Sequence, residues 1–179
     1  MLIYRGTPSG PFCDGATNWD KENAMANRVK VTAQNIADYI VSKENICPLK
    51  LQKLLYYSQA AYLVNYKKPL FDDKIEAWDR GPVVEGVYRT FKNEGFNSED
   101  VITPIKKTRL PYKARKTVDL VIKLYKDWSG EELVWQTHNE GPWKSVYEKD
   151  KNNFITNESL ISWFEDVFKY RWTTVVTII

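Results

Sequence analysis

Apolar residues recur at helical spacing along most of the chain after Thr32, and this pattern predicts a mainly α-helical fold. Thr32 is a residue type that commonly caps a helix N-terminus, and apolar side chains follow it on one face: Ile36, Tyr39 and Ile40. The next helix is predicted from Pro48 to a point before Pro69, and it is apolar over more than half of its circumference. We expect this second helix to be central, with the others packed around it.

The segment after position 80 contains the signals for a further helix. Gly81 supplies a turn, and Pro82 has the fixed φ and the missing N–H that suit the first residue of a helix. Val87 and Phe91 then share one face, and Gly95 has the position of a C-terminal cap. The spacing therefore predicts a helix from about Pro82 to Glu94.

Three more helix starts are marked by their capping residues. A long amphipathic helix is predicted over about 113–130, and at its end Ser129 and Glu132 form a capping-box pattern that begins another short helix. Gly141 with Pro142 then predicts a short helix. Thr156 is a candidate N-cap for the last helix, and the apolar residues that follow it at helical spacing are Leu160, Ile161, Trp163, Phe164, Val167 and Phe168.

Two short segments are predicted to be strands. Residues 74–78 lack helical spacing, and residues 172–179 are β-branched almost throughout, so the two could pair with each other. Residues 1–26 contain three glycines and two prolines without helical periodicity, and we expect a weakly ordered N-terminal extension there. The prediction is a mainly α protein: residues 27–179 form a single compact multi-helix domain around a central apolar helix, with one or two short strands.

The composition argues against a membrane protein, a secreted protein and a metal-binding protein. The 179 residues contain no apolar run long enough to cross a membrane and no signal-peptide pattern at the start, so we expect a cytoplasmic protein with no membrane partner. Cys13, Cys47 and His138 have no spacing that suits a metal cage, and we expect neither a metal nor a cofactor.

The net charge of +3 is too small to indicate a nucleic-acid partner by itself, but basic residues cluster locally. Residues 106–116 carry six basic side chains and no acid. This cluster is typical of a solvated loop and helix start, while an acidic partner surface and nucleic acid are two further interpretations.

The residues that could carry catalysis do not form a recognisable set. His138 has no nucleophile pattern near it, and a lone histidine before a turn is typical of a cap or of the edge of a core, or it contacts a partner. The acidic pairs are adjacent in sequence, so their side chains would diverge, and no phosphate loop or nucleophile elbow is present. We therefore expect a protein that is not an enzyme.

Arg80, Gly81 and Pro82 allow three interpretations. They can start a helix, bind an anion at its N-terminus, or recognise another protein. Pro82 removes one N–H donor, which weakens the anion interpretation. Trp78, Arg80 and Tyr88 are residue types that dominate protein–protein interfaces, which favours recognition of a protein if the segment does more than start a helix.

Four blocks of sequence, taken in order, resemble the Panacea domain, the phage-associated SocA-like family of antitoxins. These blocks are ADYIVSK, PLKLQKLLYYSQAAYL, KPLFDDKIEAWDRGPVVEGVY and THNEGPW, which lie between about Asn35 and Val146. The resemblance implies a mostly helical domain that neutralises a co-encoded protein toxin by direct binding. The alternatives are a proteolytic adaptor that delivers a toxin to a protease, and a DNA-binding regulator.

The two blocks around the tryptophans supply the candidate residues for partner binding. They are Trp78, Arg80, Gly81, Pro82, Tyr88, His138 and Trp143. Neither the residues nor the resemblance indicates an oligomeric state.

Overall fold

The computed structural model describes residues 30–102 and 108–176, and these residues are mainly α-helical. In chain order the elements are α2 (Ala33–Val41), α3 (Pro48–Tyr66), β1 (Ile75–Trp78), β2 (Gly81–Val83), α4 (Glu85–Asn93), α5 (Tyr112–Leu124), α6 (Gly130–His138), α7 (Gly141–Lys144), β3 (Phe154–Ile155) and α8 (Asn157–Val176). The predicted fold class is confirmed. The predicted extension over residues 1–26 lies outside the described residues.

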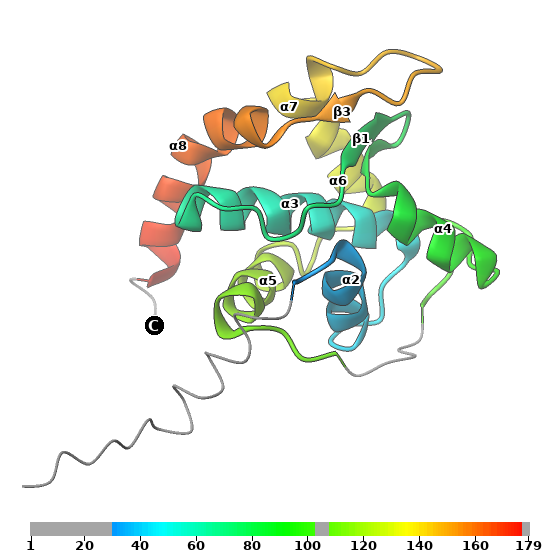
Figure 1. Cartoon of the computed structure of the whole chain (residues 1–179), viewed down its shortest axis with the longest axis horizontal. Helices are drawn as coiled ribbons and strands as arrows, with labels where there is room; N and C mark the ends of the chain where they lie inside the picture. Colours follow the sequence, from blue (N-terminus) through cyan, green and yellow to red (C-terminus); the bar gives the residue numbers. More distant parts are fainter. Residues whose placement is uncertain (1–29, 103–107, 177–179) are drawn as a thin grey trace, which may run out of the picture.

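Helix α3 is the central element, as its sequence predicts. It runs through the middle of the molecule and contacts α2, α5, α6 and α8 (Figure 1). Pro48 occupies its first turn, and Lys67 ends it in the left-handed conformation with φ of 54°. Most of its residues are buried, including polar ones. The elements that carry the functional candidates are therefore arranged around α3.

The capping residues predict the starts of α2, α6 and α8 correctly. The Thr32 hydroxyl accepts a hydrogen bond from the Asn35 amide, and the Asn35 side chain accepts one from the Thr32 amide. Ser129 and Glu132 form the predicted capping box at the start of α6, and the Thr156 hydroxyl accepts from the Ser159 amide at the start of α8. Each cap satisfies backbone N–H groups that have no partner within their own helix.

The three strands form a small antiparallel sheet in the order β2–β1–β3. The predicted strand at 74–78 is confirmed as β1, which pairs with β2 on one side and with β3 on the other. Trp78 pairs with Gly81, so Asp79 and Arg80 form the turn of the β1–β2 hairpin. Gly81 has a φ of 92°, a conformation that glycine adopts readily.

The predicted helix start at Pro82 is wrong. Pro82 lies in β2, opposite Ala77, and α4 begins at Glu85 after the cap residue Val84. Because β2 is an edge strand, a residue without an N–H donor is tolerated there. The C-terminal end of the same helix is predicted correctly, since Gly95 has a φ of 91° just after its last turn.

The predicted strand at 172–179 is also wrong. Helix α8 continues to Val176, and residues 177–179 lie outside the described part. Both sides of β1 are occupied by β2 and β3, so no position beside β1 remains for the tail. Each residue added to an existing helix forms one more backbone hydrogen bond. The free energy gained in this way outweighs the weak preference of β-branched residues for strands.

Candidate binding site around the β1–β2 turn

The structure brings all of the candidate residues together around the β1–β2 turn. Trp78, Arg80, Gly81 and Pro82 belong to the hairpin itself, and the others come from three helices: Tyr88 from α4, His138 from α6 and Trp143 from α7. The rings of Trp78 and Tyr88 lie 5.0 Å apart, edge to face. The indole N–H of Trp143 donates to the Trp78 carbonyl at 3.0 Å. Two sequence blocks, separated by 65 residues at this hydrogen bond, therefore meet at one turn.

A stack of aromatic rings lies beside the turn. The ring of Trp143 lies between those of His138, at 3.9 Å, and Tyr147, at 4.3 Å, and both pairs are nearly parallel. The Tyr147 hydroxyl donates to the Asp79 carboxylate at 3.0 Å. Trp143 is 6% exposed. This arrangement gives Trp143 a clear role in holding the turn, whatever else the surface does.

His138 is half-buried, and its Nε2 atom has no hydrogen-bond partner among the described residues. Burial lowers the pKa of His138, the positive charge of Lys53 lowers it further, and a hydrogen bond with the backbone of Asp79 acts in the opposite direction. The His138 imidazole therefore takes up a proton less readily than a free imidazole does.

Arg80 is the most exposed of the candidate residues. Its guanidinium donates to the Ser98 hydroxyl at 3.0 Å, forms an ion pair with Glu131, and lies 3.6 Å from Glu99. Both carboxylates are well exposed, at 64% and 77% of their side-chain area. Exposed ion pairs contribute little to stability, so Arg80 can exchange these partners at small cost.

Lys53 is a member of the site that sequence reasoning missed. It lies on α3, it is 0% exposed, and its Nζ atom donates to the Pro82 carbonyl at 3.0 Å. Burial, and then the positive charge of Arg80, lower its pKa to about 7, while Glu131 acts in the opposite direction. A signal was available, because Lys53 stands four residues from Leu49 and from Tyr57 on one helical face, and both of these are buried.

Gly81 is required by its neighbours as well as by its backbone. A Cβ atom at Gly81 would lie 2.7 Å from the Thr137 hydroxyl and 2.9 Å from Lys53 Nζ. Such distances are shorter than van der Waals contact allows, and no larger residue fits without displacing both side chains. The hairpin therefore packs directly against α3 and α6 at this position.

Glu140 is a second buried charged residue that sequence reasoning missed. Its carboxylate accepts hydrogen bonds from the hydroxyls of Tyr56, at 3.1 Å, and Tyr57, at 3.0 Å, and from the Gln136 amide at 3.2 Å. Burial and the nearby carboxylate raise the pKa of both tyrosines. These bonds connect α3 to the segment between α6, which ends at His138, and α7, which contains Trp143.

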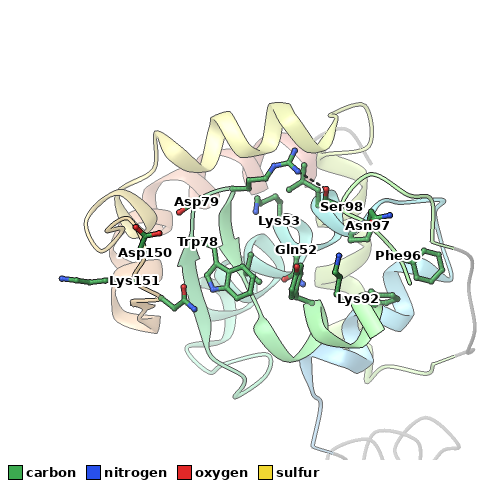
Figure 2. A pocket seen from close by; sticks show the side chains of 17 residues that line it. Gln52, Lys53, Trp78, Asp79, Lys92, Phe96, Asn97, Ser98, Asp150 and Lys151 are labelled. Atoms are coloured by element: carbon green, nitrogen blue, oxygen red, sulfur yellow. Dashed lines mark hydrogen bonds between the residues drawn. The ribbon is translucent and has the colours of Figure 1, made fainter. Parts of the chain in front are cut away.

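A pocket of about 470 Å³ opens between α3, α4 and the hairpin. Figure 2 shows Lys53 and Gln52 in the middle of this pocket, with Trp78 on one side and Lys92 on the other. Its apolar lining includes Leu49, Trp78, Val83, Tyr88, Phe91 and Phe96. This volume and this lining are typical of sites that bind a small ligand or one side chain of a partner.

None of the described residues of the basic cluster at 106–116 lines this pocket. Residues 106 and 107 fall outside the described part, while Lys113 and Arg115 lie over the rings of Tyr66 and Tyr112. The sequence makes nucleic acid the least favoured of the three interpretations of this cluster, and the structure tests none of them. Within the described ranges, none of the helices is long and apolar enough to span a bilayer, and no group of three His, Cys, Asp or Glu residues could hold a metal ion.

Comparison with known proteins identifies the family. The family model described as "Antitoxin SocA-like, Panacea domain" matches residues 51–144, which include Lys53, the hairpin and Trp143. Antitoxin SocA of Caulobacter vibrioides (strain NA1000 / CB15N) is 39% identical over 70 residues, which cover 36% of this chain and 37% of that protein. The aligned region thus spans little more than a third of the curated relative. No solved structure matches the chain. Because the family model covers more than half of its residues, the chain belongs to the antitoxin SocA-like, Panacea domain family.

Proposed function

We propose that this chain is an antitoxin that neutralises a co-encoded protein toxin by binding it directly. Membership of the SocA-like family and the name of the curated relative support an antitoxin role. The observation that carries direct binding is the convergence of the candidate residues on one turn, beside an open pocket. The toxin would contact the rim of that pocket.

The rim is defined here as Trp78, Arg80 and Tyr88, and its chemistry suits a protein partner. Trp78 and Tyr88 are half-buried and present aromatic surface, while Arg80 is exposed. Tryptophan, tyrosine and arginine are the residues that most often dominate binding free energy at interfaces. Because the ion pairs of Arg80 lie on the surface, a carboxylate of the partner can replace them.

The buried members of the site support the rim from within. Trp143 donates to the Trp78 carbonyl, and Gly81 packs against Lys53 and Thr137. Substitutions at these positions would lower the stability of the fold and affect neutralisation indirectly. A test of partner binding must therefore use the rim.

The decisive experiment is co-expression with the adjacent reading frame, measuring growth, toxin level and complex formation in the same cells. Arg80→Ala should reduce both rescue of growth and recovery of the complex. The matched control is Arg89→Ala, because Arg89 is another exposed arginine, on α4 and outside the pocket lining, with an ion pair to Glu85. Arg89→Ala should rescue growth as well as the unchanged chain does.

Each outcome of this experiment has a distinct meaning. Rescue with a stable complex that Arg80→Ala weakens supports direct neutralisation at the rim. Rescue with loss of the toxin protein would contradict it and favour a proteolytic adaptor. Full rescue by Arg80→Ala combined with Trp78→Ala would exclude the rim as the binding surface.

A further inference from the structure

The ammonium group of Lys53 is buried beside the pocket with unused hydrogen-bonding capacity. A lysine ammonium has three N–H donors. Among the described residues, the Pro82 carbonyl is the one acceptor within hydrogen-bond distance of Nζ. No carboxylate in this part of the chain forms an ion pair with Lys53, although its side chain is 0% exposed. A buried charge in this condition is unusual, because burial of a charge is costly unless a partner compensates it.

A second cation, Arg80, lines the same pocket. Arg80 is close enough for its positive charge to disfavour the charged form of Lys53. The carboxylates that pair with Arg80 are largely exposed to solvent, so they screen the repulsion only partly. An anion between the two cations would remove their repulsion and fill the free donors of Lys53.

The wall of the pocket next to Trp78 suits an apolar group, while Lys92, Lys151, Asp79 and Asp150 also line the pocket and add charges of both signs. Trp78, Phe91 and Phe96 line it together with aliphatic side chains. Pro82 supplies no N–H, and the glycine-rich backbone that commonly surrounds a phosphate group is absent from the lining residues. One singly charged acid group with an apolar body matches this arrangement better than a phosphate.

We propose that this pocket binds an organic carboxylate, which accepts hydrogen bonds from Lys53 Nζ and the Arg80 guanidinium while its apolar body packs against the aromatic wall. Arg80 is held by exposed ion pairs, so its guanidinium can exchange Glu131 and Glu99 for the carboxylate of the ligand. The carboxylate can belong to a free small acid or to the C-terminus of a peptide that ends in a bulky apolar residue. This property goes beyond toxin neutralisation and can be measured on the purified chain alone.

The test uses two pairs of probes in calorimetric titrations at pH 6.5. The first pair is 3-phenylpropionate and its neutral amide, and the second is an acetylated tripeptide ending in Phe with a free or an amidated C-terminus. At least one free acid should bind, and its amide should bind at least tenfold more weakly. Lys53→Met should weaken binding of the acid by about 10- to 100-fold, the usual effect of losing a hydrogen bond to a charged group.

The matched control is Lys50→Met, which removes a lysine from the same helix at a position outside the pocket lining. It should bind the acid with unchanged affinity. If Lys53→Met does not fold, Arg80→Gln provides the second test, since it alters an exposed side chain and should also weaken binding.

The results separate the two sources and can overturn the proposal. Binding of 3-phenylpropionate supports a free acid as ligand, and binding of the peptide alone supports a chain terminus. The proposal is overturned if neither acid binds, or if acid and amide bind equally. It is also overturned if Lys53→Met folds and binds the acid as well as the unchanged chain does. If Lys53→Met does not fold, the same result with Arg80→Gln overturns the proposal. If the unchanged chain binds the acid but does not rescue growth in the co-expression experiment, the antitoxin proposal is contradicted and the carboxylate proposal is not.

Discussion

Replacing Lys53 with methionine should change how the stability of this protein depends on pH. Burial, and then the charge of Arg80, lower the pKa of Lys53 to about 7 in the folded state, whereas its ordinary value is 10.5. Between these values the unfolded chain binds more protons than the folded one, so the free energy of unfolding rises with pH. Lys53→Met keeps an unbranched apolar stem and removes the titrating group, and this rise should then disappear.

The size of the effect follows from the two pKa values. Between pH 7 and pH 9, one group with these values adds about 2 kcal/mol to the free energy of unfolding. Other described groups with shifted pKa values contribute little in this window. The pKa of His138 lies below 6.5, and those of Tyr56 and Tyr57 lie well above 10.0.

The assay is urea unfolding at closely spaced pH values from 7 to 9 for the unchanged chain, Lys53→Met and Lys50→Met. The unchanged chain and the Lys50→Met control should show the same rise, and Lys53→Met should be nearly flat. If the unchanged chain is flat over this range, Lys53 does not titrate near pH 7. An equal rise in Lys53→Met would assign the effect to another group. Either result would refute the reasoning about the buried ammonium.

Further predictions concern glycines, the buried carboxylate and a helix cap, all measured as free energies of unfolding in urea. Gly81→Ala should lower the free energy of unfolding by about 2 kcal/mol or more, because φ is 92° and the new Cβ meets Thr137 and Lys53. Gly86→Ala, in open space on α4, should raise it by about 0.5–1 kcal/mol. Equal effects of the two substitutions would contradict the packing at the hairpin. Glu140→Ala should lower the free energy of unfolding by about 3 kcal/mol or more, because it leaves two buried tyrosine hydroxyls without their acceptor. A loss below about 1 kcal/mol would show that water replaces the carboxylate. Ser129→Ala should cost about 1 kcal/mol through loss of the capping box, and an unchanged stability would mean that the cap adds nothing.

The sequence was most informative where the cause of a structure is local. The capping boxes at Thr32 and Ser129 each depend on residues three positions apart, so their pattern is complete within one turn of helix. The apolar surface of α3 predicts its central position for a similar reason, since a helix that is apolar on most sides must be covered. The N-cap at Thr32, the capping box of Ser129 and Glu132, and the central helix were predicted with the correct residues, whereas the part that Asn35 plays in the Thr32 box was not.

The sequence was misleading where a local preference competes with distant partners. Pro82 suits the first turn of a helix, but β1 offers it a position in an edge strand. The β-branched tail favours a strand, but β2 and β3 already occupy both sides of β1. In both cases the outcome depends on which segments are neighbours in space, and a local pattern does not contain that information.

The sequence by itself determined the helical class, the central helix, most of the helix starts and the residue types of the candidate site. The tertiary structure alone decided that Lys53 and Glu140 are buried, and that the blocks around Trp78 and Trp143 meet at one turn. Lysine and glutamate are normally exposed, so neither residue type indicates burial, and the helical spacing of Lys53 with Leu49 and Tyr57 is compatible with burial without requiring it. Burial and charge pairing depend on residues brought together by the packing of α3, α6 and the hairpin, and it is this packing that creates the pocket.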